Sequence, residues 1–400
     1  MRILFILDKL PFPANTGDRL RIYNLVRRVA ERHDVWLAVL ADAPEDTSGL
    51  AHLAQFCRGI EVAYRSHQSP WAHVPGVVAY ALRGRPLELK FNYSTELMGK
   101  IGRLSARVNF DIVQIEHSYM ALYAEAFADR PNTKRILDFH NVELSQSDRI
   151  ARVEPRLEAK ARAWLHGRMM RRWEPSYAEH FDRCLTCSAV DRDLLLSANP
   201  RLRVSVAPNG VDAGAYQPLA QNSAGCSLIF VGTMSYAPSV DAMQYFCGEV
   251  LPRIRRQQDV DVWIVGKDPA PEVKKLAGNG VIVTGGVPDV VPYYRRCSVA
   301  VAPLRAGSGT RLKILEAMAL GRPVVSTSIG CEGLDVVDGR DLLIADDATD
   351  FAAKTVRLLR DETLARDLAS NGRRLVADRY DWGVVAGQLL DVYESLWRGG

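Results

Sequence analysis

The chain has 400 residues, of which 48% are hydrophobic and 24% are charged. These proportions are typical of a soluble globular protein and exclude a disordered, collagen-like or disulfide-scaffold chain, and the length suggests two to three domains. The net charge is 51 − 47 = +4, too balanced for a protein that coats nucleic acid. Residues 1–208 carry 30 basic and 24 acidic residues (+6), whereas the remainder carries 21 and 23 (−2).

The first residues, Met1–Leu7, form an apolar run that is too short for a signal peptide and predicts a buried strand. No stretch approaches the roughly 20 apolar residues of a membrane-spanning helix. The seven cysteines are scattered and odd in number, so we expect a reducing cytoplasm. Cys184 and Cys187 have Cys-x-x-Cys spacing, but no second pair follows at metal-binding distance. Two buried strand residues are therefore the better interpretation.

Short β-branched apolar runs alternate with longer amphipathic segments, and the alternation occurs twice along the chain. It predicts an α/β fold with parallel sheets covered by helices on both faces. The predicted strands are Arg2–Leu7, Val35–Leu40, Ile112–Ile115, Arg135–Phe139, Val204–Ala207, Leu228–Gly232, Val260–Val265, Val281–Thr284, Val299–Ala302, Pro323–Ser326 and Leu342–Ile344.

A cluster of Pro, Asn, Gly and Ser at 207–225 marks a seam between the two alternating halves. It predicts one domain over 1–210, a second over 222–380, and a closing helix within 381–400. Ligands of such sheets bind at the carboxyl ends of the strands, and the cleft between two facing domains is the default site.

The segment 151–175 contains seven basic and three acidic residues, interleaved with Trp164, Met169, Met170 and Trp173. An ordinary surface helix with a buried apolar stripe is one interpretation. The other is a basic amphipathic helix on an anionic membrane surface.

The most informative stretch, Pro303–Ser326, joins the end of one strand to a Gly-rich loop, a helix and the next strand. Ser308 or Thr310 is expected to cap the helix, and Gly321 to end it. A Gly-rich loop that opens a helix presents backbone N–H groups and a positive dipole end to an anion. Arg311 and Lys313 add cations to the first turn, where they are unfavourable unless an anion is bound.

Lys313 and Glu316 are three residues apart and share one face of this helix. The purely structural interpretation is a surface ion pair that stabilises the helix by about 0.2–0.5 kcal/mol. The surrounding residues are almost all apolar, which indicates a mostly buried helix whose few polar side chains line a cleft. We therefore expect Lys313 to reach a phosphate and Glu316 to accept hydrogen bonds from sugar hydroxyls.

In these and several other segments, the sequence resembles the retaining glycosyltransferases of family 4. Members of that family have the GT-B fold of two facing Rossmann-like domains. The segments that carry the resemblance are Pro208–Asp212, Phe230–Gly232, Val283–Val287 with Asp289 and Tyr293, Leu315–Val325, and Tyr380–Trp382. A narrower similarity is to the sugar transferases of PEP-CTERM/exosortase exopolysaccharide systems.

The resemblance implies a donor-binding site built from both halves of the chain, and a closing helix at 381–400 that crosses back to the first domain. The residues it assigns to the donor are Gly17, Gly232, Thr233, Gly285, Val287, Ser308, Gly309, Thr310, Arg311, Lys313 and Glu316, with Glu316 on the ribose hydroxyls. The sequence departs from the family pattern in three places. Ser308 stands where the family has the first Glu of its Glu-x7-Glu motif, and Thr233 and Pro238 replace two phosphate-binding cations. Arg311 and Lys313 are the expected substitutes.

In the first half, His117 and His140 each follow a predicted strand. The resemblance implies that His117 lies near the transferred sugar. Gly17 is expected near both the donor phosphates and the acceptor, and Asp18, Arg19 and His140 on the acceptor side. For the two histidines a purely structural role is the competing interpretation, and for Gly17 a plain turn is.

The expected reaction moves a hexosyl group from a nucleoside diphosphate sugar to a hydroxyl of a glycan or lipid-linked glycan, with retention of configuration. No Asp-x-Asp motif is present, so we expect no metal and no other cofactor. A cytoplasmic enzyme, in peripheral contact with the inner membrane face, fits these expectations. The alternatives are an epimerase or phosphorylase on the same fold, a dinucleotide-dependent oxidoreductase, and a catalytically silent binding protein. The oxidoreductase would need a G-x-G-x-x-G motif after the first strand, and none is present.

Overall fold

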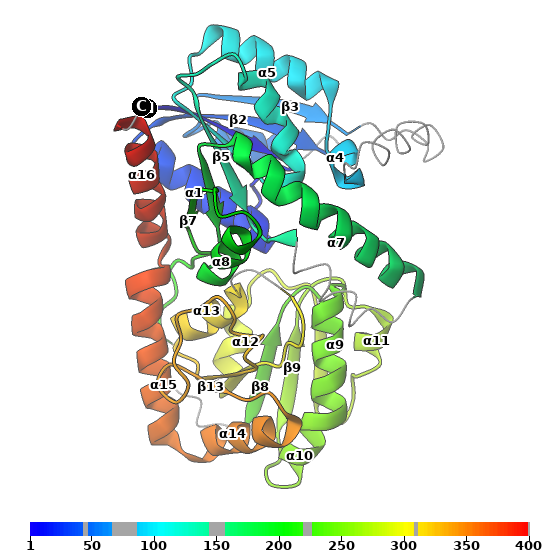
Figure 1. Ribbon diagram of the computed structural model, residues 1–400. Helices are drawn as coiled ribbons and strands as arrows, with labels where there is room; N and C mark the ends of the chain where they lie inside the picture. Colours follow the sequence, from blue (N-terminus) through cyan, green and yellow to red (C-terminus); the bar gives the residue numbers. More distant parts are fainter. Residues whose placement is uncertain (43–46, 66–85, 144–156, 219–225, 308–310, 399–400) are drawn as a thin grey trace. The chain divides into compact units, whose positions relative to one another are not determined.

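The computed structural model describes residues 1–400 except 43–46, 66–85, 144–156, 219–225, 308–310 and 399–400 (Figure 1). The chain divides into two compact units. Unit 1 comprises Met1–Ser147, Arg162–Pro208 and Val385–Gly400, and unit 2 comprises Asp148–Ala161 and Asn209–Val384. Each unit is an α/β structure built on one parallel sheet, as the alternation in the sequence predicts.

Unit 1 holds a seven-stranded parallel sheet in the order β3-β2-β1-β4-β5-β6-β7. Its strands are β1 Arg2–Leu7, β2 Asp34–Ala41, β3 Gly59–Tyr64, β4 Ile112–Glu116, β5 Lys134–Phe139, β6 Arg183–Thr186 and β7 Val204–Val206. The helices between them are α1 Gly17–Ala30, α2 Thr47–Leu53, α4 Leu87–Phe91, α5 Thr95–Arg107, the 3-10 helix η2 Ser118–Phe127, α7 Leu157–Tyr177, the 3-10 turn η3 Ala178–His180 and α8 Ala189–Ala198.

Unit 2 holds a six-stranded parallel sheet in the order β10-β9-β8-β11-β12-β13. Its strands are β8 Ser227–Val231, β9 Asp261–Val265, β10 Val281–Gly285, β11 Val299–Ala302, β12 Val324–Ser326 and β13 Leu343–Ile344. The helical segments are α9 Ala237–Tyr245, η4 Phe246–Val250, α10 Leu251–Arg255, α11 Pro271–Lys274, α12 Val291–Arg296, α13 Leu312–Ala319, α14 Ala348–Arg360, α15 Glu362–Leu375, η5 Val376–Tyr380 and α16 Trp382–Arg398.

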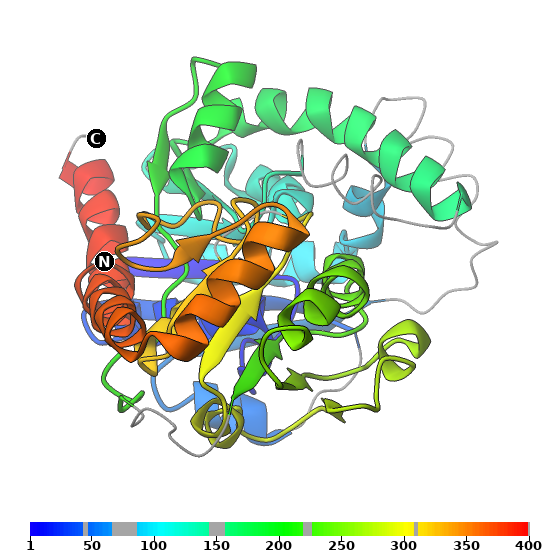
Figure 2. The same ribbon diagram turned by 90° about the horizontal axis from the view of Figure 1, so that it is seen from below.

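Strand β8 shows how the apolar sequence of unit 2 makes a sheet with a core on each face. Leu228 and Phe230 pack into one cluster, together with Phe351 of α14, while Ile229 between them packs into the other with Ile314 of α13. Successive side chains of a strand point to opposite faces, so a fully apolar run fits a strand that is covered on both sides. Figure 2 shows α14, in orange, covering one face of this sheet and running roughly along its strands.

Two details of chain organisation go beyond the sequence-based expectations, and a third agrees with them. Strand β3, Gly59–Tyr64, was not predicted; it forms the edge of the sheet and most of its residues are only half-buried, which weakens its apolar signal. The seam is ordered at Val211, whose N–H donates to Tyr380 O at 2.8 Å and whose carbonyl accepts from Trp382 N at 3.1 Å. Helix α16 begins in unit 2 and continues in unit 1, as the resemblance implies for the closing helix.

The prediction that Cys184 and Cys187 are small buried residues is confirmed. Cys184 in β6 and Cys187 just after it are fully buried and unoxidised, and burial raises the pKa of each thiol to about 12. Such thiols are inert small apolar groups. Of the helices in the described ranges, none has the length and apolar character required to cross a bilayer.

Candidate functional site

The predicted helix at 312–320 packs at the carboxyl edge of the unit-2 sheet. Helix α13 buries Ile314, Leu315 and Met318 against that sheet and leaves Lys313 and Glu316 half-buried. It ends at Ala319, before Gly321, as predicted. Its N-cap is Arg311, which makes no side-chain cap hydrogen bond. Ser308, Gly309 and Thr310 themselves lie outside the described residues.

The Lys313 side chain extends to the end of strand β8. Its Nζ lies 4.0 Å from the centroid of the Phe230 ring, and a Cβ at Gly232 would come within 2.9 Å of that Nζ. The ammonium therefore fits at this position because Gly232 has no side chain. Within the described residues, the ammonium forms neither a hydrogen bond nor an ion pair, although Arg305 nearby in the chain is fully engaged by Asp241.

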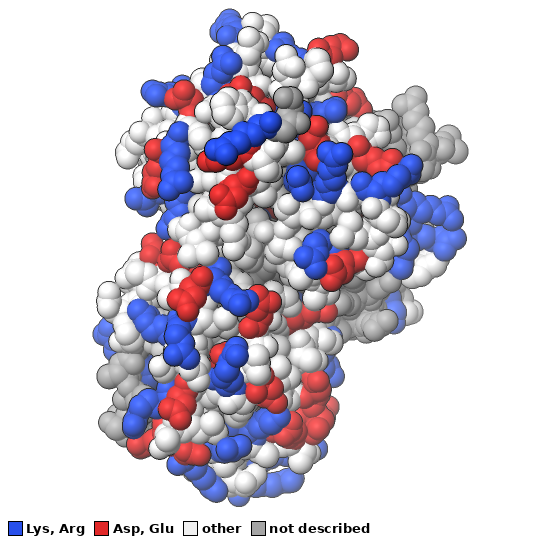
Figure 3. Space-filling view, turned by 60° about the vertical axis from the view of Figure 1, so that its left-hand side comes forward, with Lys and Arg blue, Asp and Glu red and all other residues white. Residues whose placement is uncertain are grey.

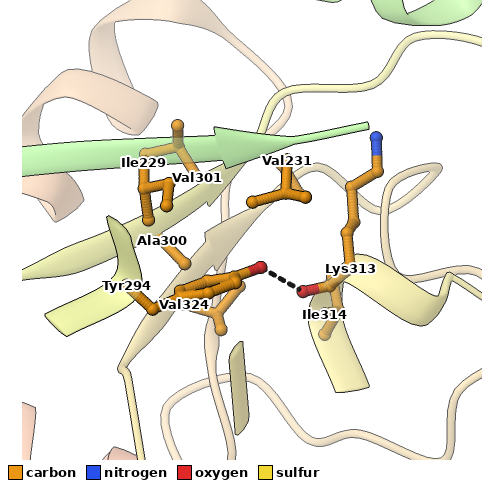
Figure 4. A pocket seen from close by; sticks show the side chains of 9 residues that line it. Ile229, Val231, Tyr294, Ala300, Val301, Lys313, Ile314 and Val324 are labelled. Carbon is orange, nitrogen blue, oxygen red and sulfur yellow. Dashed lines mark hydrogen bonds between the residues drawn. The ribbon is translucent and has the colours of Figure 1, made fainter. Parts of the chain in front are cut away.

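Figure 4 shows the surroundings of Lys313 from close by. Ile229, Ala300 and Val324 line a small pocket between the sheet and α13, while the Lys313 side chain extends past the end of the strand. The Tyr294 hydroxyl donates to the backbone oxygen of Lys313 at 3.2 Å. This bond fixes the first turn of α13, and hence the direction of the lysine. The pocket itself is a packing seam, because its lining is almost entirely apolar.

Arg311 lies next to the same lysine. A Cβ at Gly307 would meet the guanidinium nitrogens of Arg311 at 2.8 and 2.9 Å, and Gly307 has a φ of +117°, which disfavours any other residue. Burial lowers the pKa of Lys313 to about 7, and the charge of Arg311 contributes to that decrease. Two cations so placed repel each other, and a bound anion would relieve the repulsion.

Glu316, one turn further along α13, is a carboxyl group in an equally unusual position. Burial raises its pKa to about 7, against the opposing influence of Lys313. It makes no side-chain hydrogen bond or ion pair with the described part of the chain. Its charge, together with burial, raises the pKa of Tyr216, so the two side chains are neighbours. A carboxylate with unused acceptor capacity is suited to bind hydroxyl groups.

The remaining predicted residues of unit 2 lie at neighbouring strand ends. Gly285 is the last residue of β10, and its carbonyl accepts from Gly266 N at 3.2 Å at the end of β9. Val287 and Thr233 are half-buried in the loops that follow β10 and β8. These residues, with Gly232 and Lys313, lie along the carboxyl edge of one sheet, where ligands of parallel α/β sheets bind.

In unit 1 the structure brings His117 and Asp8 together at the carboxyl ends of β4 and β1. His117 Nε2 lies 3.8 Å from Asp8 Oδ1, and neither atom has a hydrogen-bond partner among the described residues although both are buried. The other oxygen, Oδ2, accepts from Tyr119 at 3.0 Å and from Lys9 at 3.2 Å. His117 has a φ of +69°, uncommon for a non-glycine residue and typical of functional sites.

His117 and Asp8 differ in their ionisation near pH 7. Burial, assisted by His140, lowers the pKa of His117 to about 4, so the imidazole is neutral near pH 7. Burial alone would raise the pKa of Asp8, but His117, Lys9 and the Tyr119 hydrogen bond lower it overall. A carboxylate oxygen and a neutral imidazole nitrogen therefore lie close together, each with unused hydrogen-bonding capacity among the described residues.

His140 belongs to a chain of buried hydrogen bonds. Its Nε2 lies 2.6 Å from Glu116 Oε2, and Glu116 Oε1 accepts from Gln114 Nε2 at 2.7 Å. The Tyr393 hydroxyl of α16 donates to Gln114 Oε1 at 2.5 Å. The His140 ring then packs against that of His117, with centroids 3.9 Å apart. The closing helix thus supports the orientation of both histidines.

Arg21 of α1 is a fully buried cation in unit 1. Its guanidinium donates to both oxygens of Asp138, with a closest contact of 2.8 Å, and to Pro208 O at 2.9 Å. Burial disfavours its charge, yet Asp138 holds its pKa above the ordinary value. Glu116, Asp138 and His140 have ligand atoms close enough to hold a metal ion. The carboxylate oxygens are already engaged by Arg21, Gln114 and His140, which accounts for the cluster without an ion.

The first turn of α1, which follows the loop after β1, carries the other predicted residues. Gly17 is the first residue of α1, and Asp18 in its first turn forms an ion pair with Lys9 at 2.6 Å. Burial opposes this charge, but Lys9 lowers the pKa of Asp18 well below its ordinary value. Arg19 is half-buried beside it. Asp18 is thereby linked through Lys9 to Asp8 and His117.

Comparison with known proteins agrees with this architecture. The family described as Glycosyltransferase Family 4 matches residues 19–214, and the family described as Glycosyl transferases group 1 matches residues 225–361. The chain belongs to a family-4-like group of glycosyltransferases. Its two Rossmann-like units have the GT-B fold.

Three similar proteins illustrate the range of this glycosyltransferase group. An uncharacterised 44.6 kDa protein in a cps region of Klebsiella pneumoniae is 22% identical over 95% of this chain and 96% of its own. A phosphatidyl-myo-inositol mannosyltransferase of Mycolicibacterium smegmatis is 29% identical over 48% of this chain; the match spans about half (52%) of that protein. Anabaena HepE, solved with UDP and glucose, has a TM-score of 0.68 at 16% identity, covering 99% of this chain and 100% of that one.

Several residues at these candidate sites were not predicted from the sequence. They are Asp8, Arg21, Gln114, Glu116 and Asp138 in unit 1, and Tyr216 and Phe230 in unit 2. One signal could have found the acidic ones: a charged residue within or directly after an apolar strand, as in Ile112–Glu116. Arg21 gives no such signal, since an arginine on an amphipathic helix is ordinarily at the surface.

Proposed function

We propose that this glycosyltransferase transfers a hexosyl group from a nucleoside diphosphate sugar to a hydroxyl of a glycan or lipid-linked glycan, with retention of configuration. The observation that carries the proposal is Lys313. A half-buried ammonium at a strand end, with no hydrogen bond to described residues and with Arg311 beside it, is an anion site. The diphosphate of a donor supplies that anion.

The roles of the residues in unit 2 follow from the chemistry of the leaving group. Negative charge builds up on the departing diphosphate, and cations held in place beforehand stabilise it without reorganisation. Arg311 would bind phosphate oxygens in a bidentate manner and Lys313 as a point charge. Glu316 would accept hydrogen bonds from the ribose hydroxyls. In this proposal the two cations do the work that a divalent metal ion does in other transferases.

Unit 1 would supply the contact to the sugar hydroxyls. Asp8 Oδ1 and His117 Nε2, neither of which has a hydrogen-bond partner among the described residues, would together bind one hydroxyl that donates to the carboxylate and accepts from the imidazole. Retention is proposed to proceed on one face of the sugar, with a donor phosphate oxygen helping to deprotonate the acceptor. The similarity to a protein in a cps region supports a role in exopolysaccharide or other surface glycan synthesis.

A thermal-shift screen against UDP, GDP, ADP and CMP tests the donor class. We expect one of these nucleotides to raise the melting temperature, and the UDP bound by Anabaena HepE makes UDP the first choice. A flat response to all four would contradict the proposal. Release of that nucleoside diphosphate from its sugar donor, dependent on an added acceptor extract, would then exclude a catalytically silent binding protein.

Comparing nucleotide with pyrophosphate binding separates the contribution of the ribose from that of the diphosphate. Glu316→Gln should weaken nucleotide binding by on the order of 10- to 100-fold, because a hydrogen bond to a charged acceptor is lost. It should leave binding of inorganic pyrophosphate unchanged, since pyrophosphate has no ribose. Glu362→Gln, at an exposed position of α15, is the matched control and should change neither. Equal losses for both ligands in Glu316→Gln would contradict the ribose assignment.

A further inference from the structure

Helix α7 has two sides of different character, and only one is explained by the packing of unit 1. At about 100° per residue, Met170, Trp173 and Glu174 fall on one side and are buried. Glu174 accepts from Ser118 there at 2.7 Å, and Met170 and Trp173 join the apolar cluster of unit 1. This side anchors the helix.

The opposite side combines large apolar groups with cations. Trp164 is 56% exposed and Leu165 is 51% exposed. The residues that share this exposed side are Leu157, Lys160, Ala161, Trp164, Leu165, Arg168, Arg171 and Arg172. They include four basic residues, and Glu158, exposed beside Leu165 at the edge of this side, is the one acidic residue there among the described side chains. The Arg168 guanidinium lies 5.9 Å from the centroid of the Trp164 ring, so cation and aromatic group share one patch.

This composition is unusual for a surface that faces only water. Over the surface seen in Figure 3, basic and acidic side chains are interspersed. A tryptophan and a leucine left half-exposed beside each other cost hydration free energy that burial would recover. Arginine side chains also have long apolar stems that cover neighbouring apolar surface while the charged ends stay in water.

We propose that the exposed side of α7 docks on the surface of an anionic lipid bilayer. Trp164 and Leu165 enter the region between headgroups and acyl chains, and Lys160, Arg168, Arg171 and Arg172 bind lipid phosphates. An anionic bilayer fits better than an apolar protein partner because four cations lie around the apolar residues and a single carboxylate, that of Glu158, lies at their edge. Interfacial helices with aromatic and basic residues bind bilayers in this manner. The docking concerns the location of the enzyme and is independent of its donor chemistry.

Vesicle co-sedimentation with the full chain tests the proposal. We expect binding to vesicles of phosphatidylglycerol and phosphatidylcholine in equal parts, weak binding to phosphatidylcholine alone, and release as salt is raised, because charged contacts at a surface are screened. Absence of binding to the anionic vesicles would overturn the proposal. A salt-sensitive self-association without vesicle binding would overturn it equally and assign the face to a second copy of the chain.

Variants locate the surface. Trp164→Ser/Leu165→Ser should weaken partitioning by on the order of tenfold, through lost apolar burial. Arg168→Gln/Arg172→Gln should weaken it by on the order of tenfold or more, at about 1 kcal/mol per basic residue. The matched controls are Trp397→Ser, which is 59% exposed on α16, and Lys274→Gln/Lys275→Gln on α11.

A folding control accompanies each variant. The melting temperature and its shift by the bound nucleotide should match the wild type, since α7 is not part of the donor site. Loss of vesicle binding with an intact nucleotide response supports the docking surface whatever the donor is. If the control variants reduce partitioning as much as the α7 variants, α7 is not the surface.

Discussion

The two units treat buried charge in opposite ways. In unit 1, Arg21 and Asp138 satisfy each other through a bidentate contact, and Glu116 is saturated by Gln114 and His140. In unit 2, Lys313 and Glu316 remain without such partners in the described part of the chain, and burial shifts the pKa of each to about 7. A satisfied ion pair holds a structure in place, whereas an unsatisfied one is available to a ligand.

The largest expected effect is a loss of stability when the satisfied ion pair between Arg21 and Asp138 is broken. Arg21→Met leaves the Asp138 carboxylate buried and unpaired, so we expect unit 1 to lose about 3–5 kcal/mol of stability. Amide hydrogen exchange in β4 and β5 measures this loss locally. Arg58→Met is the matched control, because its ion pair with Asp34 is exposed and contributes about 0–1 kcal/mol. Equal effects of the two substitutions would remove the contrast between the units.

The next effect concerns the unsatisfied pair, Lys313 and Glu316. Here a substitution should lower activity and leave stability unchanged or higher. Lys313→Met should leave unit 2 at least as stable, since it replaces a half-buried charge with an apolar chain of similar length. Donor turnover should fall by on the order of 10²-fold, as should that of Arg311→Ala. Lys274→Met, at an exposed position of α11, should change neither quantity. Wild-type turnover in the Lys313 and Arg311 variants would contradict the assignment to the diphosphate.

This contrast also explains what the sequence could predict. Lys313 and Glu316 are three residues apart on a helix that is otherwise apolar, so local spacing alone marks them as a site. Arg21 and Asp138 are 117 positions apart, and only the completed sheet brings them together. Local patterns therefore predicted the unsatisfied group and missed the satisfied one.

The fold follows the same division between local and long-range information. Strands buried on both faces, such as β8, carry continuous apolar runs and were predicted to within one or two residues. Strand β3 is an edge strand with half-exposed residues and lacks that run. The bond between Tyr393 and Gln114 joins residues 279 positions apart, and no local pattern signals it.

A smaller effect is expected where a neutral hydrogen bond supports the charged network. Tyr393→Phe leaves the Gln114 carbonyl oxygen buried without its donor and should cost about 1–3 kcal/mol. Tyr23→Phe is the control, since its hydroxyl contacts the half-buried His52 at 2.9 Å, and its cost should be below about 1 kcal/mol. The free energy of unfolding from urea titration gives both values. A Tyr393 variant no less stable than the Tyr23 variant would show that α16 does not support the histidines.

The smallest effect is a pH dependence that only the unsatisfied unit should show. Burial lowers the pKa of Lys313 to about 7, so its ammonium loses a proton as the pH rises through this value. A diphosphate binds the protonated form, hence its affinity should decrease above about pH 7, by at most tenfold per pH unit. Glu316, with its pKa raised to about 7, ionises over the same interval, and this would favour the ribose contact as the pH rises.

The measurement therefore uses the Glu316→Gln background, which removes this opposing group. In that background, affinity for the nucleoside diphosphate should decrease from about pH 7 to about pH 9. Adding Lys313→Arg should abolish the decrease, because a guanidinium stays protonated throughout this range. Parallel pH profiles in the two proteins would mean that the titrating group is not Lys313, and the lysine would then have to be assigned to packing against Phe230 rather than to the ligand.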